Sequence, residues 1–208
     1  MRINVYTDGA CSNNGKPTAK AGIGIYFGEN DSRNYCSRIS GRQTNNCAEI
    51  IAIIITADIL SKELQAGYNI NIYSDSMYAM RACTEYGAKL DALNWESKKP
   101  IPNLELVKRA YETFKQYDNV TFNYIAAHTG LMDEHSLGNE GADRWANMAI
   151  GLTNNKKTKP KNIYINLPYS EKDEGKRLGA KWDPKKKKWY IPFNSNNKQT
   201  ILNRWPAL

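Results

Sequence analysis

The sequence predicts an α/β domain with a five-stranded mixed sheet flanked by helices, followed by a small C-terminal α+β unit. Three strand-like segments come first, and strands then alternate with helix-length apolar segments. That order is typical of a mixed sheet with helices on its faces. A polar segment that contains Pro160 separates the two parts and has the composition of a linker. We therefore expect domains at residues 1–152 and 162–208, joined by a linker at 153–161.

Five strands are expected in the first domain. At the start of the chain, Ile3 and Val5 alternate with other residues and Thr7-Asp8-Gly9 follows, the pattern of a strand that runs into a turn. Two further strands would complete a meander before the first helix. The expected strands are residues 2–7, 22–27, 34–39, 69–73 and 120–126.

Four helices are expected to pack on this sheet. Asn46 and Glu49 have the spacing of a capping pair at the start of a long apolar segment. Ser76 can cap the second helix. Asn103 starts a third helix, whose apolar residues recur with a period of about 3.6. The expected helices are residues 48–64, 77–86, 103–114 and 137–150.

The C-terminal unit is expected to hold a strand at 163–167, a helix at 171–178 that ends at Gly179, and a hairpin at 181–192. The hairpin turns at residues 183–186. A unit this small buries little apolar surface, so we expect it to gain stability from the first domain.

The net charge of +8 is distributed unevenly along the chain. Residues 1–150 hold 15 Lys and Arg against 17 Asp and Glu, whereas residues 151–208 hold 14 against 4. Hydrophobic residues make up 41% of the chain and charged residues 24%, which excludes a collagen, a coiled-coil rod and a fully disordered chain. The basic excess indicates an anionic partner, such as nucleic acid or a membrane surface.

The four cysteines predict neither a disulfide framework nor a zinc site. None of Cys11, Cys36, Cys47 and Cys83 has CxxC spacing, and the two histidines complete no zinc pattern. We expect reduced thiols and a cytoplasmic protein without a targeting signal. The longest apolar run, residues 50–55, is too short to span a bilayer. No membrane association and no obligate protein partner are expected, and the chain is expected to be a monomer.

Four carboxylates occupy the ends of expected strands or lie in expected helices. Asp8 and Asp75 end the first and fourth strands, and Glu49 and Asp143 lie in helices that could reach the same edge. Each alone has a structural alternative: a turn residue for Asp8, a cap for Glu49 and Asp75, and a first-turn acid for Asp143. Converging carboxylates repel one another unless a cation is present. Oxygen ligands without Cys or His favour Mg²⁺ or Mn²⁺, and two such ions serve displacement at phosphorus.

Six segments give the chain a resemblance to cellular, type 1 ribonuclease H over nearly all of residues 2–150. Each alone is weak, but six in the right order are very specific. The resemblance implies a ribonuclease-H-like sheet. The segments are YTDGACSNNG at 6–15, AGIG at 21–24, GRQTNNCAE at 41–49, YSDS at 73–76, AHTG at 127–130 and GNEGADR at 138–144.

The resemblance implies a metal-dependent endonuclease that hydrolyses the RNA strand of RNA–DNA hybrids and leaves 5′-phosphate and 3′-hydroxyl ends. Asp8, Glu49, Asp75 and Asp143 would hold two Mg²⁺ ions, with Mn²⁺ as an alternative. His128 would assist proton transfer or product release, and neutral imidazole suits that role near pH 7. His135 matches no motif and is expected in a loop.

The resemblance also implies substrate contacts. Recognition of RNA requires reading of the 2′-hydroxyl group. The stretch 87–95, where the family carries a Lys-rich protrusion, holds one Lys, so we expect the first domain alone to bind hybrids weakly. The implied contacts are Cys11, Ser12, Asn14, Asn45 and Asn46 in the minor groove, Arg42 and Thr44 at a phosphate of the DNA strand, and Tyr78 and Trp95 in a DNA-binding channel.

The C-terminal unit resembles a small domain of unknown function found attached to DNA-handling proteins. Its lysines lie next to aromatic residues, a mixture that suits single strands or backbone contacts. The candidate contacts are Lys185, Lys186, Lys187 and Trp189. Alternatively, the aromatics form a small core and the lysines form a solvated hairpin tip.

Two other functions fit parts of the pattern. Another ribonuclease-H-like nuclease, such as a resolvase or integrase, would share the acids, but Asn14, Asn45, Asn46 and His128 argue against it. A non-catalytic hybrid-binding module would not need four converging acids, since these destabilise a protein without a metal.

Overall fold

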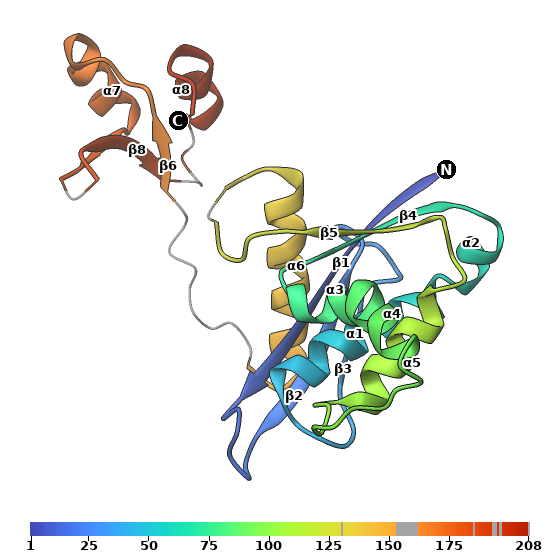
Figure 1. The fold of residues 1–208 in the computed structure, drawn as a ribbon. Coiled ribbons are helices and arrows are strands. Elements are labelled where there is room, and N and C mark those ends of the chain that lie inside the picture. The colour runs from blue at the N-terminus through green and yellow to red at the C-terminus, as the bar shows by residue number, and fades with distance from the viewer. Residues whose placement is uncertain (130, 153–161, 185, 193–194, 196, 208) are drawn as a thin grey trace. The chain divides into compact units, whose positions relative to one another are not determined.

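The computed structural model describes residues 1–129, 131–152, 162–184, 186–192, 195 and 197–207 (Figure 1). Contacts within the chain divide it into two units, Met1–Asn154 and Asn155–Leu208. The expected linker, residues 153–161, lies outside the described residues. Among the described helices, none combines the length and the apolar character needed to cross a membrane. All four cysteines are free thiols.

The first unit contains the expected five-stranded mixed sheet, in the order β3-β2-β1-β4-β5. β1 pairs antiparallel with β2 and parallel with β4, and β4 pairs parallel with β5. The parallel pairing of the first and fourth strands, on which the proposed gathering of acids depends, is thus confirmed. The strands are β1 (Arg2–Ser12), β2 (Lys20–Tyr26), β3 (Tyr35–Arg38), β4 (Asn69–Ser74) and β5 (Val120–Tyr124).

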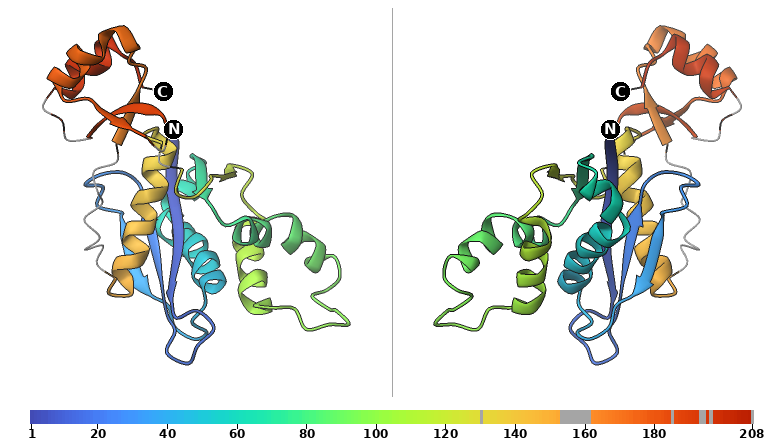
Figure 2. Two further views of the ribbon diagram at one scale, coloured as in Figure 1. Left: turned by 90° about the vertical axis from the view of Figure 1, so that its left-hand side faces the viewer. Right: turned by 90° about the vertical axis from the view of Figure 1, so that its right-hand side faces the viewer.

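Helices cover both faces of this sheet. Figure 2 shows α6 along one face and α1, together with α3 to α5, on the other. This is the arrangement expected from a meander followed by strand–helix alternation. The helices are α1 (Asn45–Ile59), α2 (Ser61–Gln65), α3 (Met77–Cys83), α4 (Glu85–Asp91), α5 (Leu104–Phe114) and α6 (Glu134–Ala149).

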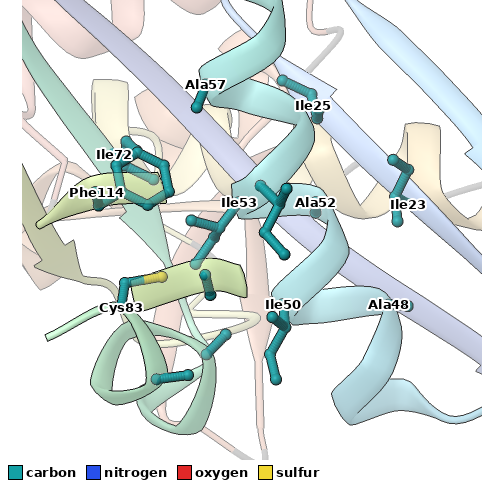
Figure 3. Close-up of a cluster of buried hydrophobic side chains, with 14 of the residues drawn as sticks. Ile23, Ile25, Ala48, Ile50, Ala52, Ile53, Ala57, Ile72, Cys83 and Phe114 are labelled. Atoms are coloured by element: carbon teal, nitrogen blue, oxygen red, sulfur yellow. The ribbon is translucent and has the colours of Figure 1, made fainter. Parts of the chain in front are cut away.

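The main hydrophobic core lies between α1 and the sheet (Figure 3). Ile50 and Ile53 of α1 are fully buried, as are Ile23 and Ile25 of β2. Burial of a side chain of this size stabilises the fold by roughly 1.5–3 kcal/mol. Phe114 of α5 extends the same core. The core therefore fixes α1, and with it Glu49, against the strands.

Two glycines let helices approach the sheet closely. A Cβ atom on Gly9 of β1 would lie 2.5 Å from the backbone nitrogen of Glu49, so any larger residue would push the first turns of α1 away. A Cβ atom on Gly24 of β2 would collide with the Ala142 carbonyl oxygen of α6. Gly9 therefore brings α1 close to β1, which carries Asp8, and Gly24 brings α6 close to β2 at the residue paired with Asp8.

Several helix boundaries differ from those expected. The N-cap of α1 is Thr44, whose hydroxyl accepts a hydrogen bond from the Cys47 N–H at 3.2 Å; the expected cap, Asn46, is already helical. The segment expected as one helix at 48–64 breaks at Leu60, which separates α1 from α2. The helix expected at 77–86 breaks at Thr84, whose φ of −126° and ψ of −114° are not helical. The Ser76 cap is confirmed, since its hydroxyl accepts from Ala79 N–H.

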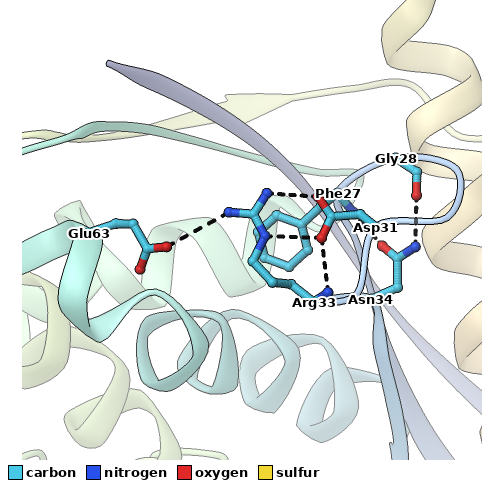
Figure 4. A network of polar contacts seen from close by, with 6 residues as sticks. All are labelled: Phe27, Gly28, Asp31, Arg33, Asn34 and Glu63. Carbon is cyan, nitrogen blue, oxygen red and sulfur yellow. Dashed lines mark hydrogen bonds and ion pairs between the residues drawn. The ribbon is translucent and has the colours of Figure 1, made fainter.

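A polar network fixes the loop between β2 and β3 (Figure 4). Arg33 forms an ion pair with Asp31 at 2.7 Å and lies 4.5 Å from the centre of the Phe27 ring. Asn34 accepts from Phe27 N–H and donates to the Gly28 carbonyl. Because these groups are partly exposed, the network contributes little to stability and mainly sets the loop conformation.

The second unit is a three-stranded antiparallel sheet, in the order β6-β8-β7, with three helical segments. Gly179 ends α7 with a φ of 106°, as expected. The C-terminal α8 was not expected; it supplies Ile201 to a core that also holds Trp189 and Trp205. The elements are β6 (Asn162–Ile165), η1 (Tyr169–Glu171), α7 (Lys172–Leu178), β7 (Lys181–Asp183), β8 (Lys188–Pro192) and α8 (Lys198–Arg204).

Candidate active site

The four acids come from different elements of the first unit. Asp8 lies in β1, and Asp75 follows the end of β4. Because Thr7 is in register with Ser74, the last residue of β4, Asp8 and Asp75 are next to each other where β4 ends. Asp8 does not end the first strand as expected, because β1 continues to Ser12 along β2. Glu49 lies in the second turn of α1, which Gly9 allows to touch β1. Asp143 lies in the third turn of α6, so the reading of it as a first-turn acid is wrong.

The acids line a common hollow of about 300 Å³. Asp8, Glu49 and Asp75 each place one carboxylate oxygen within 4.8 Å of the others, and Asp143 lines the same hollow. The lining residues are Asp8, Gly9, Ala10, Cys11, Asn45, Glu49, Asp75, His128, Asp143 and Asn147.

Two of these carboxylates are nearly inaccessible to water. Asp8 is 7% exposed and Glu49 is 4% exposed. Burial, reinforced by the charges of Asp75 and Asp143, raises the pKa of Asp8 to about 8. Burial also raises the pKa of Glu49, and the charges of Asp8 and Asp75 add to this effect. Desolvated acids this close disfavour their own ionisation unless a cation compensates them.

The donor set fits a divalent cation. The Oε2 atom of Glu49 is buried and has no hydrogen-bond partner among the described residues, although buried polar atoms are rarely left unpaired. The neighbouring oxygens of Asp8 and Asp75 lie within reach of the same ion. A set made of carboxylate oxygens suits Mg²⁺ or Mn²⁺.

Three amide side chains orient the acids, a role that the sequence did not predict for any of them. Asn45 donates to Glu49 Oε1 at 3.3 Å, and Asn139 donates to Asp75 Oδ2 at 3.3 Å. Asn147 donates to Asp143 Oδ1 at 2.7 Å. The i, i+4 spacing of Asp143 and Asn147 along α6 was the signal that could have identified Asn147. Asn139 contacts Asp75, which follows β4, and had no such signal.

The two histidines have different environments. His128 is exposed, has a φ of 49° and lines the hollow. His135 was expected in a loop but is the second residue of α6. Its ring stacks on Tyr73 with the centroids 4.3 Å apart, and its Nδ1 lies 3.1 Å from the Tyr6 hydroxyl. His135 therefore packs α6 onto β1 and β4.

Only some of the implied minor-groove contacts line the hollow that holds the acids. Cys11 and Asn45 line the hollow. Ser12, Asn14 and Asn46 do not; Asn14 and Asn46 are exposed, and the Ser12 hydroxyl donates to the Lys20 carbonyl.

Two of the residues implied for the phosphate pocket and the DNA-binding channel, Arg42 and Tyr78, contact Asn103. The side-chain oxygen Oδ1 of Asn103 accepts from Arg42 Nη1 at 3.4 Å, and its side-chain Nδ2 donates to the Tyr78 hydroxyl at 3.3 Å. Thr44 is the α1 N-cap, so its hydroxyl already has a partner. Trp95 is half-buried against α5, and its indole donates to Asp91. Asn103 was expected only to start a helix; its link between Arg42 and Tyr78 was not expected.

The candidate contacts of the second unit differ in burial. Trp189 is 9% exposed and belongs to the hydrophobic core, which favours the alternative that the aromatics form a small core. Lys186 and Lys187 are exposed. Lys185 lies outside the described residues.

A different family model matches each of the two units. The RNase H family model matches residues 1–151. A domain of unknown function (DUF5710) matches residues 162–206.

Curated relatives cover the first unit. Ribonuclease H1 of Mus musculus is 35% identical over 146 residues, which are 69% of this chain and 48% of the mouse protein. Ribonuclease H of Schizosaccharomyces pombe is 34% identical over 145 residues, with 68% and 50% of the two chains covered. Ribonuclease H of Ehrlichia canis is 33% identical over 151 residues, with 72% and 94% covered. The chain thus spans about half the length of the first two relatives and nearly all of the third.

Solved structures share the fold. The PFV RNase H domain superimposes with a TM-score of 0.59 at 21% identity and covers 72% of this chain and 94% of its own. LC9-RNase H1, described as a type 1 RNase H with the type 2 active-site motif, has a TM-score of 0.56 at 19% identity, with 72% of each chain covered. The sheet order, the convergence of acids and the family match agree, and the chain belongs to the RNase H family.

Proposed function

We propose that the first unit is a metal-dependent endonuclease that hydrolyses the RNA strand of RNA–DNA hybrids and leaves 5′-phosphate and 3′-hydroxyl ends. The observation that carries this proposal is the group formed by Asp8, Glu49 and Asp75, whose oxygens lie within 4.8 Å of one another in a chain of the RNase H family. The names of the curated relatives support the same activity.

In this proposal Asp8, Glu49, Asp75 and Asp143 hold two Mg²⁺ ions, with Mn²⁺ as an alternative. Such ions, when bound, supply an activated water and stabilise the leaving 3′-oxygen. The protein's own contribution is to hold the carboxylates in place. The amides of Asn45, Asn139 and Asn147 restrict their carboxylate partners, as outer hydrogen bonds commonly do around metal ligands.

His128 is proposed to move protons at the site or to assist product release. It is exposed and lines the same hollow as the acids, so its imidazole can exchange protons with both the hollow and bulk water. A neutral imidazole can accept a proton near pH 7.

The substrate is proposed to lie across the hollow. Cys11 and Asn45 line the same hollow as the acids and, in this proposal, would contact the 2′-hydroxyl at the cleavage site, the group that distinguishes RNA from DNA. Ser12, Asn14 and Asn46 would contact the minor groove on either side. Arg42, with Tyr78 and Trp95 beyond it, would contact the DNA strand.

The test uses a labelled RNA–DNA hybrid, a double-stranded RNA and a double-stranded DNA, each with Mg²⁺ or EDTA. We expect cleavage of the RNA strand of the hybrid with Mg²⁺ only, and its loss in Asp75→Asn, which removes one ligand charge while keeping the side-chain shape. Cleavage of the DNA duplex would instead indicate a resolvase-like or integrase-like nuclease. Binding of the hybrid without cleavage would indicate a non-catalytic module.

A further inference from the structure

The small sheet of the second unit has one covered face. Residues directly opposite each other in antiparallel strands project to the same face. Ile165, Trp189 and Trp182 form one such row across β6, β8 and β7. Ile165 and Trp189 are buried in one cluster with Ile201 and Trp205 of the α8 segment. The α8 side of the unit therefore covers this face at β6 and β8, whereas Trp182 of β7 is 48% exposed.

The other face of the sheet carries aromatic and basic residues. Tyr164, Tyr190 and Lys181 form a row across it, and the two tyrosine rings have centroids 5.9 Å apart. Lys188 and Lys181 are exposed, and both tyrosines are half-buried. The ammonium group of Lys186 lies 4.5 Å from the centre of the Tyr164 ring, so the hairpin turn also places a cation over this face. We call these five residues the tyrosine–lysine face.

Four cations of the helical side, in contrast, are paired with carboxylates or a hydroxyl. The acids of this side lie in η1 and α7, and each has a basic partner within 4 Å. Lys172 donates to the Tyr169 hydroxyl at 2.8 Å. The ion pairs are Lys176–Asp173, Arg177–Glu174, Arg204–Glu171 and Arg204–Glu174.

The tyrosine–lysine face keeps its positive charge. Within the part of the chain that the structure describes, Lys181, Lys186 and Lys188 have no carboxylate within ion-pair distance. The carboxylate of Asp183 lies on the same face and accepts hydrogen bonds from the Tyr164 hydroxyl at 2.6 Å and from the Lys186 N–H at 3.1 Å. Three cations and one carboxylate give this face a net positive charge.

We propose that the tyrosine–lysine face binds single-stranded nucleic acid. Tyr164 and Tyr190 provide surfaces on which unpaired bases stack, and Lys181, Lys186 and Lys188 contact the phosphates. Aromatic rings combined with a positive surface are the usual components of single-strand binding. A duplex presents its phosphates but not its base faces, so the tyrosines favour a single strand. This site requires no metal and lies in a different unit from the acids, and so it goes beyond the proposed hydrolysis.

The first experiment measures the affinity of the full chain for a fluorescent thymidine oligonucleotide of about 12 residues, a length within the usual site size. EDTA is present, and salt is varied. Each lost phosphate contact lowers the salt slope for a single strand by about 0.7. Lys181→Gln/Lys188→Gln should therefore lower the slope by about 1.4 and weaken binding at least tenfold at about 0.1 M salt. The matched control, Lys172→Gln/Lys176→Gln, removes the same charge from the helical side and should change neither quantity.

The second experiment tests base stacking with a strand of equal length and charge that lacks bases. Wild-type protein should prefer the base-bearing strand about tenfold, and Tyr190→Leu should lose this preference while keeping the salt slope. Circular dichroism and thermal unfolding verify that each variant is folded. Equal losses of oligonucleotide affinity in the two lysine double variants would overturn the proposal. A wild-type protein without preference for the base-bearing strand would also overturn it, as would binding to anionic vesicles without binding to the oligonucleotide. Hybrid cleavage with Mg²⁺ is assayed in parallel. If only the proposed hydrolysis is wrong, cleavage is absent while single-strand binding is unaffected.

Discussion

At the scale of single residues, Asp8 and Glu49 link the chemistry of the site to the stability of the fold. Both are buried, and burial raises the pKa of each above its ordinary value. A carboxylate with a raised pKa binds its proton more tightly in the folded than in the unfolded chain. Between the two pKa values the folded state therefore holds more protons, and the free energy of unfolding falls as the pH rises.

This fall of the free energy of unfolding with rising pH gives a prediction for the metal-free protein. From about pH 4, the ordinary pKa of Asp, to pH 8, the folded pKa of Asp8, the free energy of unfolding should fall by at least about 1 kcal/mol. Added Mg²⁺ should restore stability at pH 8 but have less effect at pH 5, where Asp8 holds its proton. Thermal unfolding with Mg²⁺ or EDTA measures both effects.

Asp8→Asn is the matched control for this pH dependence. The amide keeps the shape of the side chain but cannot ionise, so the variant should unfold with a flatter pH profile and respond less to Mg²⁺. A wild-type protein that becomes more stable between pH 4 and pH 8 in EDTA would contradict the prediction.

The sequence predicted the acids but not their support. Asp8 and Asp75 could be placed together because strand order determines which strand ends share an edge. Asn139 could not be assigned, since its partner Asp75 follows β4 and no local spacing in the sequence links the two residues. The burial of Trp189 could have been predicted. In the strand Lys188-Trp189-Tyr190-Ile191, successive side chains point to opposite faces, so Trp189 shares a face with the apolar Ile191.

At the scale of elements, the start of α1 determines where Glu49 lies. Thr44 caps this helix through its hydroxyl, whereas the sequence spacing had favoured Asn46. Both residues are common N-caps, and only the conformation of the chain decides between them: Thr44 is extended, with a φ of −137° and a ψ of 157°. The breaks at Leu60 and Thr84 likewise escaped prediction, because no Gly or Pro marks either of them.

Substitution of each candidate residue tests whether Thr44 or Asn46 caps α1. Thr44→Ala should lower the free energy of unfolding by about 1 kcal/mol, the usual cost of a lost N-cap. Asn46→Ala should change it by less than about 0.5 kcal/mol, since Asn46 is an exposed helical residue and such sites tolerate alanine. Urea denaturation of the two variants measures both values, and the reverse order would restore Asn46 as the cap.

At the scale of the whole molecule, charge divides between the two units. Residues 1–150 hold 15 basic and 17 acidic residues, and residues 151–208 hold 14 and 4. The acidic excess of the first part includes the carboxylates that line the hollow. Counting charges along the sequence was enough to predict this division. It did not reveal that four cations of the helical side have carboxylate or hydroxyl partners whereas, among the described residues, Lys181, Lys186 and Lys188 have no carboxylate within ion-pair distance. That difference depends on the folded arrangement of the unit.

Removal of residues 155–208 tests what the basic unit adds to hydrolysis. The first unit has its own core, so the shortened chain should fold and cleave the hybrid at saturating substrate with an unchanged kcat. Its KM for the hybrid should rise about tenfold at about 0.1 M salt and depend less on salt, because phosphate contacts supply the salt-dependent part of the affinity. Steady-state kinetics over a salt series measures both, with Asp75→Asn as the inactive control. A KM and a salt slope equal to those of the full chain would show that the basic unit does not contribute to hybrid binding.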